Sequence, residues 1–486
     1  MVRSVPKVRI ALISATVAAL AAAVAAAVLP ASAAAPLRVA GQADAGQATS
    51  SAMTAEVSPD FTRIPGVARQ TPPTTGQCEQ SLHIACYTPN QLRAAYQLPT
   101  LYGRGITGRG ETIVIEDSYG SPTIKSDLAT FDRQFGYPNP PKFSIIQPIG
   151  KVAKFNPKNA NMAGWQYETT LDVEYAHTVA PGASIVLVET PATGGGSTER
   201  QVMQAEEYIV NHKLGAMISE SFSGTEVGYR SAAQLQPLRA GILDAYRHHV
   251  SILASSGDAG ATTVAFSGSG YYNRREVNWQ ASDPLVTGVG GTQLKQSGAS
   301  YTSVAWNDTY NTSVNRDWFG STRAVPYATG GGKSAIFARP TYQNGVKSLT
   351  GAKRGVPDIS MSAACSGAVT VYSSDQPGQP GKAGWSEACG TSESAPEFAG
   401  IVALADQVAG RWLGLINPTL YKLLAAHAPG LVNDTAGNNT VSFNGGSPVK
   451  RYTVAGYNAR KGYSMVTGAG TINASLFVYE LAGKKP

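Results

Sequence analysis

The chain has 486 residues, of which 43% are hydrophobic and 15% are charged, so it can bury a large core. Such a length favours two or three domains, although α/β folds often hold a longer chain as one unit. Part of the formal charge of +7 falls within the first nine residues, and no basic run interleaved with aromatic residues follows, so we expect no nucleic-acid partner.

Residues 1–33 have the pattern of a secretory signal peptide. A basic start is followed by an alanine-rich apolar run, residues 10–29, and by Ala31-Ser32-Ala33, which is typical of a cleavage site. The alternative is a membrane anchor, because the apolar run approaches the length that spans a bilayer. The cleavage pattern directly after the run favours secretion, so we expect an extracellular protein without stable membrane association.

Residues 34–76 are rich in Ala, Thr, Pro and Gly and show no sustained periodicity. This composition predicts a flexible leader or a short propeptide. We expect the remainder, residues 77–486, to form one domain.

Short apolar runs and segments of helical spacing alternate along that domain. The patterns predict strands at residues 112–116, 143–146, 184–188, 216–219, 251–254 and 285–289. They predict helices at residues 124–135, 165–177, 197–212 and 237–248. Strands without polar alternation, separated by helices, predict an α/β fold with a mostly parallel sheet flanked by helices on both faces. For residues 299–350 we expect loops and hairpins.

Four cysteines in an exported chain suggest disulfides, with three connectivities to choose from. Nearness in sequence favours the pairs Cys78–Cys86 and Cys365–Cys389. A zinc site is disfavoured, because the sequence contains no CxxC pair and no Cys/His cluster.

Gly390-Thr391-Ser392 precedes an apolar run of helical character, residues 398–408. The Ser392 hydroxyl is therefore expected at a loop–helix junction, where free N–H groups favour developing negative charge. Alone this pattern is weak, because a serine before a helix is most often a cap. A serine nucleophile also needs a base, and none of the six histidines stands in a Gly-rich turn that would present a catalytic imidazole. A Ser-His-Asp triad is therefore poorly supported.

Carboxylates give a better candidate for the base. Glu168 and Asp172 are four residues apart and share one face of a predicted helix, among largely apolar or aromatic neighbours. Sharing a proton would remove their repulsion and raise one pKa. Asp258 is a candidate oxyanion donor. It follows a predicted strand within Ser256-Gly257-Asp258 and, if protonated, could donate a hydrogen bond to an oxyanion. The alternatives are a solvated acidic face for the pair and an ordinary turn residue for Asp258.

Several short blocks in this order resemble the sedolisin family of serine-carboxyl peptidases. The matching blocks are Trp165…Glu168…Asp172, Ala180-Pro181-Gly182-Ala183, Ser256-Gly257-Asp258, Val289-Gly290-Gly291-Thr292, Gly330-Gly331-Gly332-Lys333-Ser334, Val356-Pro357-Asp358-Ile359 and Gly390-Thr391-Ser392. The resemblance runs from about residue 87 to about residue 470 and implies a subtilisin-like fold. It further implies that Ser392 is the nucleophile, Glu168 the general base, Asp172 its supporting carboxylate and Asp258 the oxyanion-hole residue.

Two departures from the family pattern follow from the same comparison. The family usually carries a long folded pro-domain, whereas only residues 34–86 separate the expected signal peptide from the catalytic pattern. The family's calcium site is incomplete, because Ser464 stands at its second acidic position. The matching positions are Asp434, Thr435, Arg460 and Gly462. Since calcium affinity rises with the number of carboxylates, we expect calcium to bind weakly or not at all.

Together these features predict a secreted, monomeric serine-carboxyl endopeptidase that acts on protein or peptide substrates at acidic pH, with calcium as the one cofactor considered. One alternative is a tripeptidyl peptidase of the same family, which requires a blocked subsite that the sequence does not identify. The other alternative is a non-catalytic secreted binding protein on the same scaffold. The four intact catalytic positions argue against it.

Overall fold

The computed structural model of the chain describes residues 39–40, 57–64, 68–192, 199–265, 270–314, 325–433, 436–446 and 448–486. These residues all belong to one of the two units into which the chain divides, residues 36–486. The predicted signal peptide, residues 1–33, lies outside the described residues. Within the described ranges, no helix combines the length and the hydropathy that a membrane span requires.

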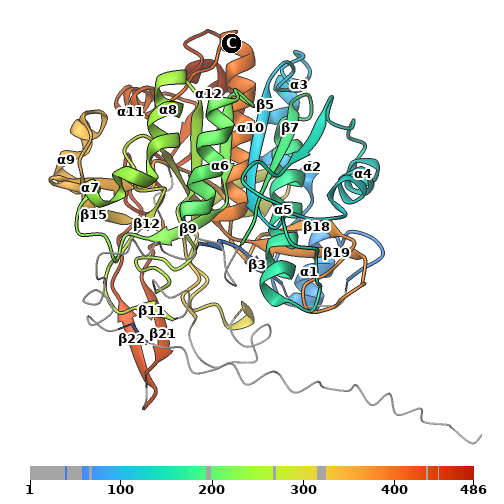
Figure 1. The fold of residues 1–486 in the computed structure, drawn as a ribbon, viewed down its shortest axis with the longest axis horizontal. Helices are drawn as coiled ribbons and strands as arrows, with labels where there is room; N and C mark the ends of the chain where they lie inside the picture. Colours follow the sequence, from blue (N-terminus) through green and yellow to red (C-terminus); the bar gives the residue numbers. More distant parts are fainter. Residues whose placement is uncertain are drawn as a thin grey trace, which may run out of the picture. The chain divides into compact units, whose positions relative to one another are not determined.

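A sheet of eight strands forms the centre of the described unit (Figure 1). Its parallel strands, in spatial order, are β6 (Phe143–Ile146), β7 (Ser184–Thr190), β5 (Thr112–Ser118), β8 (Met217–Glu220), β10 (Ser251–Ser255), β13 (Thr287–Ser297) and β17 (Ile359–Ser362). The remaining strand, β14 (Ser300–Ala305), pairs antiparallel with the second half of β13. The predicted mostly parallel sheet is therefore present.

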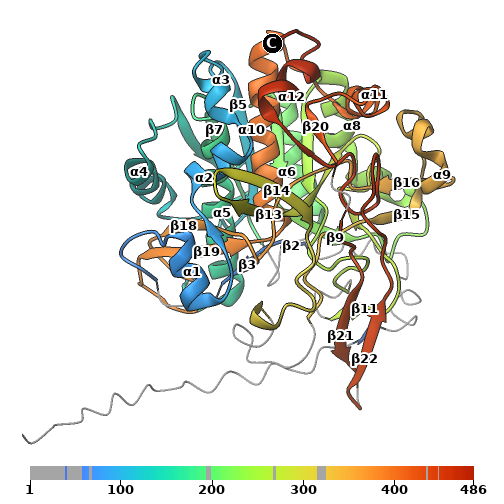
Figure 2. The same cartoon turned by 180° about the vertical axis from the view of Figure 1, so that it is seen from behind.

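Helices cover both faces of this sheet (Figures 1 and 2). One face packs against α6 (Glu199–Asn211) and α8 (Ala240–His248), and the other against α5 (Ala160–Val179) and α10 (Thr391–Ala409), with α12 (Ala474–Leu481) packed on α10. Side chains of one strand divide between the two layers. Ile113 and Ile115 of β5 pack in the same core cluster as Phe398 of α10, whereas Val114 packs with the α6 side. Because this strand is covered on both faces, its residues Ile113, Val114 and Ile115 are all apolar.

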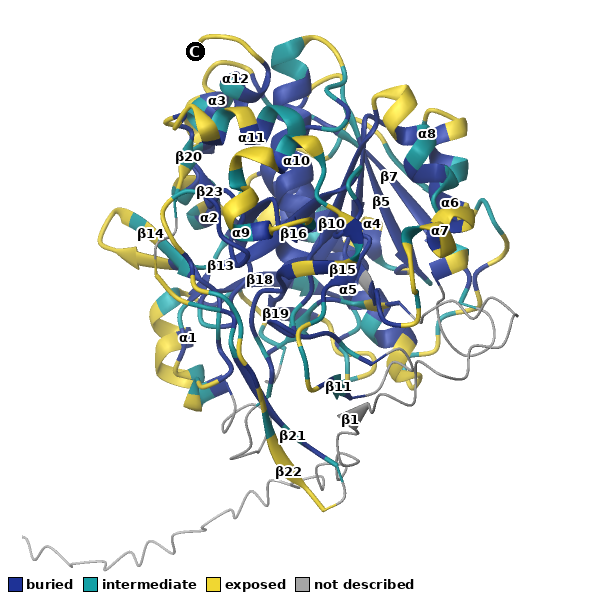
Figure 3. Cartoon of the chain, turned by 90° about the vertical axis from the view of Figure 1, so that its left-hand side faces the viewer, coloured by how far each residue is buried: buried dark blue, intermediate teal, exposed yellow. Residues whose placement is uncertain are grey.

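The helix α10 is buried along most of its length, from Thr391 to Asp406 (Figure 3). It ends at Gly410, which has φ +68°, because a residue without a Cβ adopts this left-handed conformation freely. Pro396 is the sixth residue of α10, since the helix begins at Thr391. Proline removes a donor at this depth, which leaves the carbonyl of Ser392 without its helical partner.

Both predicted disulfides are confirmed. Cys78 and Cys86 join α1 (Thr75–Leu82) to the short strand β4 (Cys86–Tyr87). Cys365 and Cys389 join the turn after β17 to the residue directly before Gly390. This second bridge fixes the backbone that enters α10.

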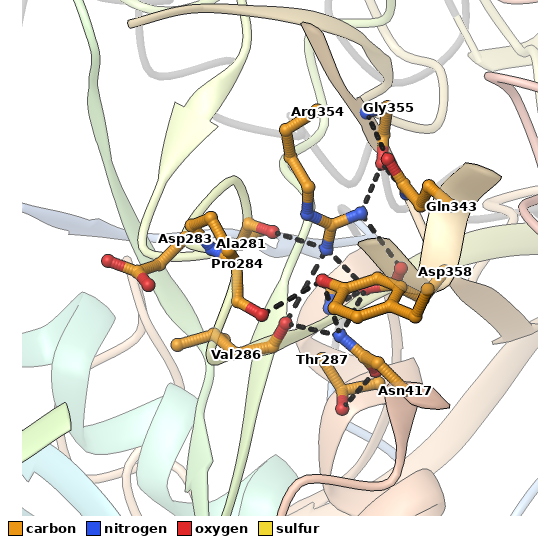
Figure 4. A network of polar contacts seen from close by, with 12 residues as sticks. Ala281, Asp283, Pro284, Val286, Thr287, Gln343, Arg354, Gly355, Asp358 and Asn417 are labelled. Atoms are coloured by element: carbon orange, nitrogen blue, oxygen red, sulfur yellow. Dashed lines mark hydrogen bonds and ion pairs between the residues drawn. The ribbon is translucent and has the colours of Figure 1, made fainter. Parts of the chain in front are cut away.

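The Val356-Pro357-Asp358-Ile359 block has a structural explanation in a buried ion pair (Figure 4). Both oxygens of the Asp358 carboxylate accept from the Arg354 guanidinium, and both side chains are fully buried. The backbone N–H of Gly288 and the Tyr421 hydroxyl also donate to Asp358, at 2.9 Å each. The pair therefore ties β13, β17 and α11 (Asn417–Ala425) together beneath the sheet edge.

Part of the segment before the catalytic pattern takes part in the fold. Residues 34–76 were predicted to be a flexible leader or a short propeptide, and within them residues 57–64 contain two short strands that pair with distant strands. The strand β2 (Ser58–Pro59) pairs antiparallel with β9 (Phe222–Thr225), and β3 (Thr62–Arg63) pairs antiparallel with β19 (Gly384–Cys389). Val57 and Ile64 at the two ends of this segment are 4% and 1% exposed. Burial and pairing with distant strands order a segment that has no local periodicity of its own.

Candidate active site

Ser392 lies in the first turn of α10 and is fully buried. Its Oγ donates a hydrogen bond of 3.0 Å to the carbonyl oxygen of Ser221, which directly follows β8. In return, the Ser221 hydroxyl donates at 3.3 Å to the Ser392 carbonyl, the group that Pro396 leaves without a helical donor. The sequence around Ser392 therefore couples the start of α10 to the carboxyl end of a central strand.

Glu168 and Asp172 lie on α5, which packs beside α10, and both carboxyl groups are fully buried. Burial raises the pKa of Glu168 well above its usual range, and the negative charges of Asp172 and Asp117 raise it further. Burial also raises the pKa of Asp172 well above its usual range, with Asp117 adding to the shift. Burial and mutual repulsion therefore both favour the protonated form of these two carboxyls.

The Ser392 hydroxyl lies close enough to Glu168 to lower the pKa of that carboxyl in opposition to burial. Its well-aligned hydrogen bond nevertheless goes to Ser221, and neither Glu168 oxygen has a partner of good geometry within the described structure. A rotation about the Ser392 side chain is thus required before its proton can pass to Glu168. Catalytic hydrogen bonds often align only when substrate is bound.

Asp117 is a further carboxyl of this cluster that sequence reasoning missed. It lies near the carboxyl end of β5, is fully buried, and raises the pKa values of both Glu168 and Asp172. Burial raises the pKa of Asp117 itself to about 7, against a hydrogen bond from Thr169. A signal was present, because an acidic residue ending a buried parallel strand lies where catalytic groups gather.

Asp258 follows β10 and faces the first residues of α10. Its Oδ1 accepts two hydrogen bonds of 2.8 Å, from the backbone N–H and the hydroxyl of Thr391. Its Oδ2 lies toward Gly390, where a Cβ would come within 2.5 Å of that oxygen. Burial raises the pKa of Asp258 well above its usual range and Asp60 adds to the shift, while the bonds from Thr391 oppose it. Because Oδ1 is occupied as an acceptor, Oδ2 is the oxygen that can carry the proton and donate it.

The histidine on α5, His177, has its contacts away from Ser392. His177 shares α5 with the two carboxyls, but its Nε2 lies 2.7 Å from the carbonyl oxygen of Pro138 and 3.3 Å from Asp132. Burial lowers the pKa of His177 to about 4. These contacts explain a buried neutral imidazole without any role at Ser392.

The expected calcium site is only partly described. Asp434 and Thr435 lie outside the described residues. Of the rest, the Ser464 hydroxyl accepts from the backbone N–H groups of Val466 and Thr467, and the N–H of Gly462 donates to Asn433. The described part of this site holds Ser464 in its own turn, and weak calcium binding stays a prediction.

Among the described residues, one further group gathers metal-binding residue types: Cys78, Cys86 and Glu387. The two cysteines form a disulfide with each other, so neither supplies a thiolate. This group is therefore not a metal site.

Comparisons with known proteins identify relatives of the chain. No protein-family model matches the chain. The chain is 30% identical over 400 residues to kumamolisin of Bacillus sp. (strain MN-32), a match that covers 81% of the chain and 63% of kumamolisin. It is 27% identical over 426 residues to tripeptidyl-peptidase 1 of Rattus norvegicus, covering 83% of the chain and 66% of that protein. The chain thus spans less than two thirds of the length of these relatives.

The fold is similar to that of a solved structure. Pseudomonas sedolisin, a serine-carboxyl proteinase complexed with two molecules of pseudo-iodotyrostatin, superposes with a TM-score of 0.64 at 23% identity. The superposition covers 81% of the chain and 97% of the solved one. The predicted α/β, subtilisin-like fold is confirmed by this likeness.

Proposed function

The chain belongs to the sedolisin family, and we propose that it is a secreted serine-carboxyl endopeptidase that cleaves protein or peptide substrates at acidic pH. One observation carries the proposal. At the start of α10, the Ser392 hydroxyl lies beside the Glu168 carboxyl of α5, and Asp258 faces the same turn from the end of β10. This arrangement offers a nucleophile, a base and an oxyanion donor within one buried cluster.

Each group has a defined task in the proposed reaction. Ser392 Oγ attacks the carbonyl carbon of the substrate and its proton passes to Glu168, which later returns the proton to the leaving amine. Asp172 shares the negative charge of Glu168, and their coupling keeps one proton on the pair. Protonated Asp258 donates from Oδ2 to the oxyanion, together with the backbone N–H of Ser392.

The acidic working range follows from Asp258. An ionised carboxylate cannot donate a hydrogen bond, so the oxyanion donor exists only below the raised pKa of this group. Glu168 sets the opposite limit, because a base must be ionised to accept a proton. Activity is therefore bounded on both sides.

Secretion is supported by the signal-peptide pattern and by the two disulfides, which persist in oxidising compartments. We expect a monomer. Calcium takes no part in the proposed steps.

An active-site fluorophosphonate probe tests the proposal against the non-catalytic alternative. The probe should label the wild type at acidic pH and should not label Ser392→Ala. Ser394→Ala is the matched control, because Ser394 lies in the same helical turn and its hydroxyl bonds only to the carbonyl of Thr391. Equal labelling of the wild type and Ser392→Ala, or no labelling of either at any pH, contradicts the proposal.

A further inference from the structure

Residues 57–64 of the chain run in extended conformation across the start of α10. The strands β2 and β3, drawn in blue, pass below the lower end of α10 in Figures 1 and 2. On one side of Asp60 the segment pairs antiparallel with β9, and on the other side it pairs antiparallel with β19. Antiparallel addition to an exposed strand is a common way for a protein to bind an extended peptide.

The backbone of Asp60 is bound on both sides of its peptide unit. Its N–H donates to the carbonyl of Ser221 at 3.2 Å, and its carbonyl oxygen accepts from the N–H of Ser392 at 3.0 Å. The absence of a Cβ at Gly390 makes room for this carbonyl, since a Cβ there would lie 2.3 Å from the Asp60 oxygen and 2.5 Å from Asp258 Oδ2. The carbonyl of Asp60 therefore lies where the two proposed oxyanion donors converge.

The side chain of Asp60 is buried and contacts the end of a central strand. It is 9% exposed, and its Oδ2 accepts a hydrogen bond of 2.7 Å from the Ser255 hydroxyl. Ser255 is the last residue of β10 and is itself fully buried, so the sheet holds the donor rigidly. A buried hydroxyl aimed at a carboxyl discriminates against side chains that cannot accept from it.

The residue on the other side of the peptide bond also has a defined contact. The ring of Phe61 stacks on Tyr167 with centroids 5.4 Å apart and an interplanar angle of 29°. Tyr167 precedes Glu168 on α5 and its hydroxyl is paired with Ser386, so its ring is fixed beside the cluster. Stacked rings favour an aromatic residue at this position.

We propose that residues 57–64 occupy the substrate groove, that the chain cleaves its own Asp60–Phe61 bond, and that Ser255 gives the enzyme a preference for aspartate before the scissile bond. This inference rests on the proposed function and adds its substrate class. Val57, the fourth residue before the bond, is buried in the groove, and the chain continues before it, so the groove accepts an internal segment, as an endopeptidase requires.

The reaction balances with the groups present and water. Ser392 Oγ forms a bond to the Asp60 carbonyl carbon and gives its proton to Glu168. The bond between that carbon and the Phe61 nitrogen breaks, and the nitrogen takes the proton as the new amino terminus. Water then attacks the ester, again with Glu168 as the base, which releases a carboxyl terminus at Asp60 and restores the Ser392 hydroxyl.

The first test follows the full chain from neutral to acidic pH by intact mass and N-terminal sequencing. The wild type should acquire an amino terminus at Phe61, and Ser392→Ala should not. Asp60→Ala, with a melting curve to confirm folding, should slow cleavage at this bond at least about tenfold, because the variant lacks the acceptor for the buried Ser255 hydroxyl.

The second test measures specificity in trans with the activated enzyme. The eight-residue peptide Val-Ser-Pro-Asp-Phe-Thr-Arg-Ile should be cleaved after Asp, and faster than the same peptide with Leu in place of Asp. Ser255→Ala should reduce this Asp/Leu ratio of kcat/KM about tenfold or more. Ser256→Ala is the matched control, since its hydroxyl bonds to the carbonyl of Gly330 and should leave the ratio unchanged.

The outcomes separate the two proposals. Acidic peptidase activity that depends on Ser392, with a mature terminus elsewhere or an Asp/Leu ratio unchanged by Ser255→Ala, overturns this inference and leaves the proposed function standing. Cleavage after Asp60 in Ser392→Ala at the wild-type rate overturns both.

Discussion

Thr391 and Asp258 are joined by two hydrogen bonds to one oxygen: the backbone N–H and the hydroxyl of Thr391 both donate to Oδ1 of Asp258 at 2.8 Å. Thr391 directly precedes Ser392, so this contact fixes the orientation of Asp258 relative to the nucleophile. It also leaves Oδ2 as the oxygen available to donate toward the Asp60 carbonyl.

Asp258→Asn should weaken the alkaline decline of activity. The amide keeps an acceptor for Thr391 and supplies an N–H donor at every pH, whereas Asp258 loses its donor when it ionises. Losing one oxyanion donor costs on the order of 10²–10³ in rate, so the activity of the wild type should fall steeply as the pH rises through the raised pKa of Asp258. The measurement is kcat/KM against pH for both proteins, and an unchanged alkaline limb in the variant would show that Asp258 does not set it.

Asp117→Asn should retain acidic activity within a few-fold, because the pKa of about 7 keeps Asp117 protonated and neutral in the working range. Asparagine has the same shape and no charge, so the environment of Glu168 and Asp172 changes little at acidic pH. The check is kcat/KM for the variant at the wild-type optimum. A loss of more than about 100-fold, roughly 2.7 kcal/mol, would show that an ionised Asp117 is required.

Stability should fall as pH rises from the acidic range. Burial raises the pKa of Glu220 to about 8 and that of Asp406 to about 8, above the values of an unfolded chain. Such groups stabilise the fold fully below their unfolded pKa, near ~4, and lose this contribution as pH rises through the folded pKa. The melting temperature of Ser392→Ala, which avoids self-digestion, should therefore decline between about pH 4 and pH 8.

Glu220→Gln on the same background serves as the control. It should reduce the pH slope of the unfolding free energy by about 1.4 kcal/mol per pH unit between the two pKa values. A melting temperature that rises toward neutral pH would contradict this account of the buried carboxyls.

Asp358→Asn should destabilise the fold strongly. Removing one charge leaves Arg354 buried without its counter-ion, and breaking a buried pair costs about 3–5 kcal/mol. Asp244→Asn is the matched control, because its partner Arg247 is 66% exposed and such a pair contributes about 0–1 kcal/mol. Urea unfolding on the Ser392→Ala background measures the free energy of unfolding of both variants. Equal losses would show that the buried Arg354–Asp358 pair contributes no more stability than the exposed pair.

Local patterns predicted much of the sheet and its helices. The strand at residues 143–146 and the helix at residues 124–135 were predicted with the observed bounds, since Gly136 with φ +74° ends that helix. The strand predicted to end at residue 289 continues to Ser297, because its second half pairs antiparallel with β14, a contact that the apolar run does not reveal.

The site was predicted in part. Ser392, Glu168, Asp172 and Asp258 come together as the motifs indicated, and their catalytic roles remain predictions. Asp60 could not be found from sequence, since its place depends on pairing with strands more than 150 residues away along the chain. Long-range pairing of this kind leaves no local period.

The most direct test of the central claim is whether a carboxylate on α5 serves as the base for Ser392. Glu168→Gln should lower kcat/KM for a peptide substrate at the acidic optimum by about 10³-fold or more, with an unchanged melting curve. Glu174→Gln is the matched control, because Glu174 is equally buried on α5 but accepts from the backbone of Tyr372, and it should stay within a few-fold of wild type. Near-wild-type turnover by folded Glu168→Gln would contradict the account.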